Sequence, residues 1–123
     1  MTQKKGLKKF LERNPKTSVV AVENSKIVGA ILCGHDGRRG CLYHVCVDEK
    51  YRRQGIGKAM VVAVMNALQE EGINHVSLIA FAQNDIGNTF WNTIGWQKRQ
   101  DLNYYDFILN TENITQFNVQ QEG

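Results

Sequence analysis

Residues 45–58 read VCVDEKYRRQGIGK, and this stretch carries the strongest structural signal in the chain. Its β-branched start favours a strand, and from Ile56 the apolar residues recur at the spacing of a helix until Gly72. Two glycines, Gly55 and Gly57, therefore lie where a strand gives way to a helix. Glycine permits close approach of the backbone, and a helix start leaves N–H groups unpaired. The stretch predicts a site for an anion such as a pyrophosphate.

Basic residues in the same stretch favour this interpretation, but a plain turn is an equal alternative. Arg52, Arg53 and Lys58 surround the two glycines. A tight turn with solvated basic side chains explains the same pattern about equally well. The spacing matches neither GxxxxGK followed by Ser or Thr nor GxGxxG, so the Walker and Rossmann types of phosphate loop are excluded.

The remaining periodicity predicts an α+β fold over residues 1–109, taken as a single domain. Helices are expected over residues 4–13, from Ile56 to Gly72, and from Asn84 or Asp85 through Ile94. Strands are expected over residues 17–22, 26–35, 41–47, 75–81, 96–100 and 102–109. The first three strands would form an antiparallel meander, and the long helix a right-handed crossover between the third and fourth. Residues 110–123 are expected to be a loose polar tail.

The composition is that of an ordinary soluble globular protein. The 123 residues carry a net charge of +3, which is too small to argue for nucleic acid as a partner. Three cysteines without CxxC spacing are typical of reduced thiols in a cytoplasmic protein, and neither a disulfide framework nor a metal site is expected. No apolar run suits a signal peptide or a membrane span, so no membrane partner is expected.

Three motifs, taken together, resemble the GNAT family of N-acetyltransferases. The matching residues, in chain order, are Val45, Cys46, Val47 and Asp48; Arg52, Gly55 and Gly57; and Asn84, Gly87, Phe90, Trp91, Gly95 and Trp96. The first group is similar to the family's fourth strand, the second to its pyrophosphate loop, and the third to the run after its fifth strand. The resemblance covers residues 17–109.

This resemblance implies the family's fold and reaction. The fold is a mixed, mostly antiparallel sheet flanked by helices, and the reaction transfers acetyl from acetyl-CoA to an amine of a small molecule or to a protein lysine. The implied cofactor-binding residues are Val45, Cys46, Val47, Arg52, Arg53, Gln54, Gly55, Ile56, Gly57, Lys58, Asn84 and Trp91. Residues 53–58 would hold the pyrophosphate and Asn84 the pantetheine arm. Val45 and Val47 would bind the pantetheine and the thioester carbonyl, where the fourth and fifth strands splay apart.

Candidates for the catalytic acid and base depend on where the chain departs from the family. The family commonly has a Tyr acid where this chain has Trp91, whose indole N–H is too weak an acid for that role. His44 is the first candidate for the base, and a structural strand histidine is an equal alternative. Tyr105, or Tyr104, on the closing hairpin is the candidate acid, although CoA thiolate leaves well enough to need none. Some members that acetylate protein N-termini carry a Glu where this chain has Ile79, which argues against that acceptor.

The start of the chain departs from the family as well. The family's first strand and helix have no counterpart ahead of residues 4–13, so an exposed apolar edge is expected at residues 18–22. Such an edge predicts a homodimer, unless the chain is a piece of a longer protein. Residues 36–40 are expected to form a hairpin tip, although Arg38 and Arg39 there also suit an acidic acceptor.

Two other functions compete with acetyl transfer. A catalytically weak acetyl-CoA-binding module is the main alternative, because of Trp91, Ile79 and the short start. Binding of nucleic acid by the lysine-rich first helix is disfavoured, because no aromatic platform interleaves with those lysines.

Overall fold

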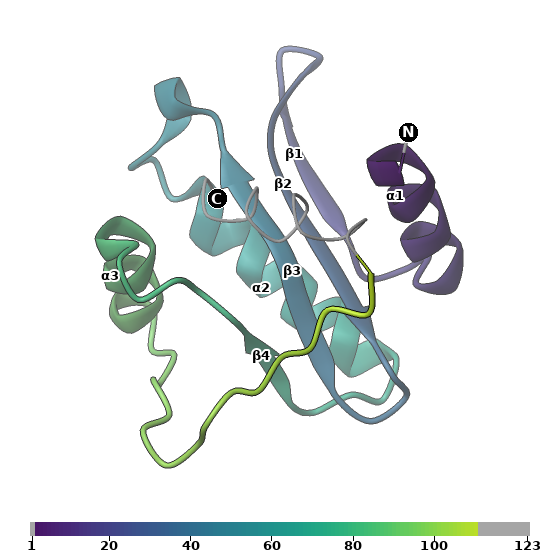
Figure 1. The fold of residues 1–123 in the computed structure, drawn as a ribbon. Helices are drawn as coiled ribbons and strands as arrows, with labels where there is room; N and C mark the ends of the chain where they lie inside the picture. The colour runs from purple at the N-terminus through teal and green to yellow at the C-terminus, as the bar shows by residue number, and fades with distance from the viewer. Residues whose placement is uncertain (1, 111–123) are drawn as a thin grey trace. The chain divides into compact units, whose positions relative to one another are not determined.

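The computed structural model describes residues 2–110, which form two compact units, residues 2–79 and residues 80–110. The elements of the first unit are α1 (Thr2–Arg13), β1 (Val19–Glu23), β2 (Lys26–His35), β3 (Gly40–Val47), the short 3-10 helix η1 (Glu49–Tyr51), α2 (Ile56–Glu70) and β4 (Val76–Leu78) (Figure 1). The second unit contains α3 (Asp85–Thr93). The tail predicted over residues 110–123 lies outside the described residues from residue 111 onward.

A four-stranded sheet in the order β1-β2-β3-β4 forms the base of the first unit. β1, β2 and β3 are antiparallel neighbours, as the meander predicted. β4 pairs with β3 in parallel, and α2 supplies the crossover that a parallel pair requires. The mixed, mostly antiparallel sheet of the predicted fold class is therefore confirmed.

The core lies between α2 and one face of this sheet (Figure 1). Its buried apolar residues are Val28, Ile31, Cys33, Leu42, Met60, Val61, Val64, Leu68 and Ile73. The helix lies so close to two strand glycines that an added side chain would require Met60 or Leu68 to shift. A Cβ atom on Gly29 would lie 2.9 Å from the Cε of Met60, and one on Gly40 would lie 2.8 Å from a Cδ of Leu68. The apolar stripe predicted from Ile56 onward therefore faces the sheet.

The first helix, α1, begins two residues earlier than predicted and is only partly buried. Phe10 packs edge-on against Tyr43 of β3, with ring centroids 5.3 Å apart. Leu7 and Leu11, the other members of the predicted apolar stripe, remain exposed. Pro15 follows the end of the helix, as its effect on the preceding residue predicts.

The predicted closing hairpin is not formed. No residue of the described chain after α3 is in a strand, so the strands predicted at residues 96–100 and 102–109 are wrong. Alternating apolar residues form a strand only where a neighbour pairs with them and covers one face. Here Tyr105, Phe107 and Leu109 are all exposed. The strand predicted at residues 75–81 is also too long, since β4 pairs with β3 over only three residues.

Candidate active site

The loop between β3 and α2 is fixed to the end of β3 by hydrogen bonds. Asp48 precedes η1, and its carboxylate accepts the backbone N–H of Lys50 at 3.0 Å. The Nε of Arg52 donates to the carbonyl of Val47 at 3.1 Å. One of the cations predicted to bind the cofactor therefore also anchors the loop, a role that its position in the motif did not reveal.

Two residues with left-handed backbones turn the chain into α2. Arg53 has a φ of +65° and Gly55 a φ of +83°. Gly55 is the N-cap of α2, and the space that its missing Cβ would occupy is open. Glycine therefore serves here for its backbone conformation, and the open space beside it leaves room for a ligand.

The first turn of α2 presents main-chain donors together with positive charge. The first hydrogen bond of the helix joins the N–H of Ala59 to the carbonyl of Gly55 at 3.0 Å. The N–H groups of residues 56–58 precede that bond, and no described residue accepts from them. This turn holds no acidic residue, and Arg53 and Lys58 are exposed around it. A helix start of this kind favours a phosphate group.

One extra residue interrupts the register of β3. Leu42 of β3 lies opposite Cys33 of β2. The next residue pair along the strands, however, is Leu32 with His44, so Tyr43 is left over as a β-bulge. Backbone groups point alternately to the two sides of a strand, so one extra residue changes which residues face β2 and which face β4.

The residues after the bulge direct N–H donors to the open side of β3. The N–H of Asp48 donates to the carbonyl of Val28 on β2 at 2.8 Å. Alternation along the strand then points the N–H groups of Val45 and Val47 away from β2. β4 occupies that side only as far as Leu42. The N–H groups of the two valines therefore lie on the side of β3 where β4 does not pair.

His44 lies on the sheet face opposite α2. Gly29 is on the α2 face, because of its closeness to Met60, and its cross-strand partner Val47 shares that face. Side chains alternate along β2, so Leu32, which lies opposite His44, is on the other face. The His44 side chain is half-buried, and no described residue forms a hydrogen bond with its ring.

Asn84 and Trp91 belong to the second unit, where both have structural roles. The Oδ1 of Asn84 accepts the N–H of Gly87 at 3.1 Å and so caps α3, as predicted. The Trp91 ring packs against Phe90 and Trp96, with centroid distances of 4.9 and 4.8 Å. The amide nitrogen of Asn84 is left as a donor, while the indole is part of an aromatic cluster.

The predicted role of Tyr105 depended on a closing hairpin that the structure does not form. The tyrosine is 86% exposed and lies in a stretch without regular structure. The hairpin that was to orient its hydroxyl is not formed. Of the predicted site residues, the structure gathers those from His44 to Lys58 on one strand, loop and helix start.

Comparisons with known proteins identify the family to which this chain belongs. The profile of the acetyltransferase (GNAT) family matches residues 2–96. N-alpha-acetyltransferase 30 of Schizosaccharomyces pombe is 26% identical over 106 residues, which cover 82% of this chain and 69% of the yeast protein.

Solved structures share the fold at lower identity. Ard1 from Thermoplasma volcanium has a TM-score of 0.68 and 23% identity, and the match covers 72% of this chain but only 61% of Ard1. The aminoglycoside N-acetyltransferase AAC(6')-Iy in complex with CoA has a TM-score of 0.72 and 16% identity, and the match covers 87% of each chain. The resemblance found in the three motifs is thus confirmed, and the chain belongs to the GNAT family of acetyl-CoA-dependent N-acetyltransferases.

Proposed function

We propose that this protein transfers the acetyl group of acetyl-CoA to an amine at the open edge of β3. The observation that carries the proposal is the register shift in β3, which turns the N–H groups of Val45 and Val47 to that edge. The same strand leads directly into the loop and the start of α2. Residues 45–58 thus offer donors for a thioester at one end and for a pyrophosphate at the other.

The pyrophosphate is assigned to the main chain at the start of α2. Three N–H groups at residues 56–58 are without acceptors in the described chain, and the surface of Gly55 is open. Arg53 and Lys58 add charge that matches two phosphate groups. Binding through the main chain makes the site depend on backbone geometry more than on any single side chain.

The thioester carbonyl is assigned to the N–H groups of Val45 and Val47. When an amine attacks the carbonyl carbon, negative charge develops on the carbonyl oxygen. Donors already fixed in that position bind the charged oxygen more strongly than the neutral carbonyl, which lowers the barrier. A sheet strand holds such donors without any further rearrangement.

His44 is assigned as the base that takes the proton of the amine. Its imidazole lies on the face opposite α2, and no described residue occupies its nitrogens. In the reaction a C–N bond forms between amine and acetyl group, and the C–S bond breaks with its electron pair moving to sulfur. The amine proton passes to the neutral imidazole, and the thiolate leaves.

No side chain is assigned as the acid. Trp91 is packed between two aromatic rings, and Tyr105 lacks the hairpin that was expected to orient it. CoA thiolate is a good leaving group, so an acid is not required. A packed Trp91 in place of a catalytic tyrosine also favours the second candidate function, a catalytically weak acetyl-CoA-binding module.

The acceptor is proposed to be an amine of a small molecule or of a protein, such as a lysine. The yeast relative is named as an N-alpha-acetyltransferase, and AAC(6')-Iy acts, by its name, on aminoglycosides. These acceptors share little besides an amino group, so the class of acceptor is proposed no more narrowly. Ile79 argues against the α-amine of a protein N-terminus.

A homodimer is proposed as well. β1 pairs on one side only, with β2, so it forms an edge of the sheet in the described chain. Val20 and Val22 on this strand are 56% and 59% exposed. Apolar edges of this kind are usually paired or covered, and a second copy is the proposed cover.

The location of the protein in the cell is considered last. No helix within the described residues is long and apolar enough to cross a membrane. The cytoplasmic location suggested by the cysteines stays a prediction.

Replacing Gly55 by Val tests the pyrophosphate assignment. Valine is disfavoured at a φ of +83°, and its side chain would fill the open space beside the helix start. We expect the Kd for acetyl-CoA, measured by calorimetry, to rise about tenfold or more, which equals about 1.4 kcal/mol. The matched control is Gly37→Val, because Gly37 has a φ of +95° and open surroundings at a hairpin tip. An unchanged Kd in folded Gly55→Val, or an equal rise in the control, contradicts the assignment.

Replacing His44 by Ala tests the assignment of the base. We expect kcat to fall roughly a hundredfold or more, while the Kd for acetyl-CoA stays nearly unchanged, because the ring acts on the acceptor. His75→Ala, at an exposed residue, is the control. A His44→Ala enzyme with wild-type kcat and pH profile would return His44 to a structural role.

Sedimentation velocity tests the homodimer. We expect the wild-type protein to sediment at about twice its 14.0 kDa chain mass and Val20→Lys to sediment as a monomer, because the lysine brings like charges together at the paired edge. Val62→Lys, at an exposed valine on α2, should leave the dimer intact. A wild-type monomer at micromolar concentration rules the dimer out.

A further inference from the structure

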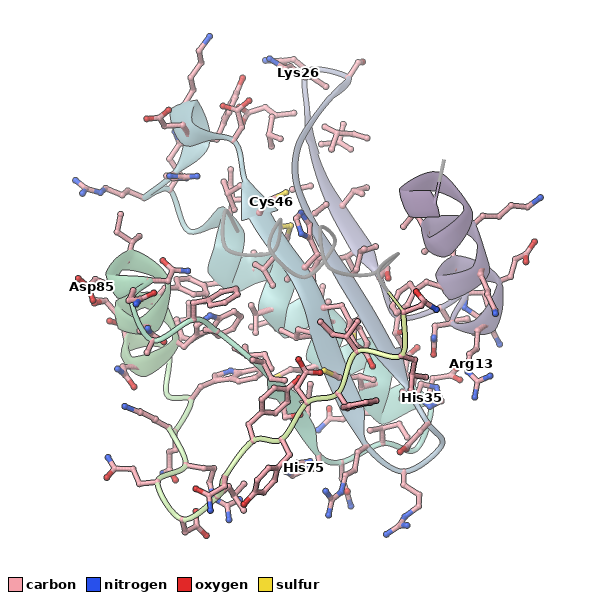
Figure 2. The ribbon with its side chains drawn as sticks, in the orientation of Figure 1. Arg13, Lys26, His35, Cys46, His75 and Asp85 are labelled. Atoms are coloured by element: carbon pink, nitrogen blue, oxygen red, sulfur yellow. The ribbon has the colours of Figure 1, made fainter. Side chains whose placement is uncertain are left out.

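A pocket of about 410 Å³ opens in the first unit, between the end of α1, the hairpin of β2 and β3, and the start of β3. It is lined by residues of both helix and sheet, among them Arg13, Asn14, His35 and Arg39. Figure 2 labels Arg13 and His35, which come from α1 and β2 and lie at the same end of the unit. None of these four residues belongs to the proposed acetyl-CoA site.

Asn14 lines this pocket and offers an amide donor to it. The side chain is buried, with 8% exposure, and its Oδ1 accepts the backbone N–H of His35 at 3.0 Å. A Cβ on Gly34 would lie 2.7 Å from the amide nitrogen of Asn14, so helix and strand are in close contact. No described residue accepts a hydrogen bond from that nitrogen. No side-chain nitrogen or oxygen of the described residues is both fully buried and unpartnered, so this nitrogen keeps some contact with solvent and is available to an acceptor in the pocket.

Two guanidinium groups of the pocket are also without acidic partners. Neither Arg13 nor Arg39 forms an ion pair with any described residue. The nearby carboxylate of Asp36 is already held by the backbone, because one of its oxygens accepts the N–H groups of Arg38 and Arg39 at 2.8 Å each. These bonds lower the pKa of Asp36, so the group stays ionised near neutral pH.

The imidazole of His35 adds no positive charge to the pocket. Its Nδ1 accepts the backbone N–H of Gly37 at 2.9 Å, which requires an unprotonated nitrogen there. The ring proton is then on Nε2, which lies 3.7 Å from a carboxylate oxygen of Glu71. With two arginines and one aspartate, the lining of the pocket carries a net charge of about +1, which suits a monoanion.

Two aromatic rings form another wall of the pocket, which Ser77 of β4 also lines. The rings of Phe10 and Tyr43 meet edge to face, and both line the pocket beside Cys41. Burial raises the pKa of the Cys41 thiol, so this side chain stays neutral. A ligand that fits this wall has an apolar body next to its charged group.

We propose that this pocket binds a small carboxylate with an apolar or aromatic body. The carboxylate is held by Arg13, Arg39 and the amide of Asn14, and the body lies against Phe10 and Tyr43. Planar guanidinium groups match a carboxylate through paired hydrogen bonds. The ligand is either a separate small acid or an acceptor that carries its own carboxylate. The proposal does not depend on acetyl transfer.

The test is a titration of the full chain with benzoate, followed by the amide chemical shifts of residues around the pocket. We expect saturable shifts near Gly37 and Gly40, and affinity at least tenfold weaker for the neutral analogue benzamide. Arg13→Gln and Arg39→Gln should each weaken benzoate binding about tenfold in folded protein. Arg38→Gln is the matched control, since it removes the same charge from the same hairpin outside the pocket lining.

Three results would overturn the proposal. Benzamide binding as well as benzoate would show that charge is not recognised. Equal weakening by Arg38→Gln would show a general effect of positive charge, and tighter binding of phenyl phosphate would replace the carboxylate with a phosphate. No acetyl-CoA is used in these titrations, so their outcome is independent of the proposed enzyme activity.

The acetyl-transfer assay distinguishes the two possible sources of the carboxylate, a separate small acid and the acceptor itself. Inhibition by benzoate that is competitive with the amine assigns the carboxylate to the acceptor. Binding of benzoate without such inhibition assigns the pocket to a separate small acid. Either result supports the carboxylate pocket itself.

Discussion

A strand forms backbone hydrogen bonds on both of its sides only where a neighbouring strand lies on each side. β3 pairs with β4 over only three of its eight residues. The bulge at Tyr43 decides which backbone groups are left over beyond that point. Without it, Val45 and Val47 would turn their N–H groups toward β2. With it, these donors face the open edge, immediately before the loop that leads into α2. The proposed binding of acetyl-CoA depends on this arrangement.

The two faces of the sheet differ in what they carry. α2 covers one face and packs closely against β2 and β3 at Gly29 and Gly40. The opposite face carries His44. The pocket lined by Arg13, Asn14 and Arg39 lies near the beginning of the same strand. The core thus lies on one face of the sheet, and the proposed base lies on the other.

Much of the first unit could be predicted from the sequence because its signals are local. Alternation predicted the meander of β1 to β3, and the helical repeat predicted α2. The anion site at the glycines and their basic neighbours stays a proposal. The prediction of two closing strands was wrong because the alternating apolar residues around Tyr105 have no strand to pair with in the described chain. The bulge at Tyr43 and the Asn14 amide leave no local trace, since each depends on contacts between distant segments.

Hydrogen exchange of single main-chain amides, with and without acetyl-CoA, shows whether the N–H groups of Val45 and Val47 bind the cofactor. In the free protein the amides of Val45 and Val47 should exchange rapidly, and the amide of Cys46, which faces β2, should be protected. Saturating acetyl-CoA should slow exchange at Val45, Val47 and residues 56–58 at least tenfold and leave Cys46 unchanged. Protection of Val45 and Val47 already in the free protein, or rapid exchange at both with acetyl-CoA bound, would contradict the account.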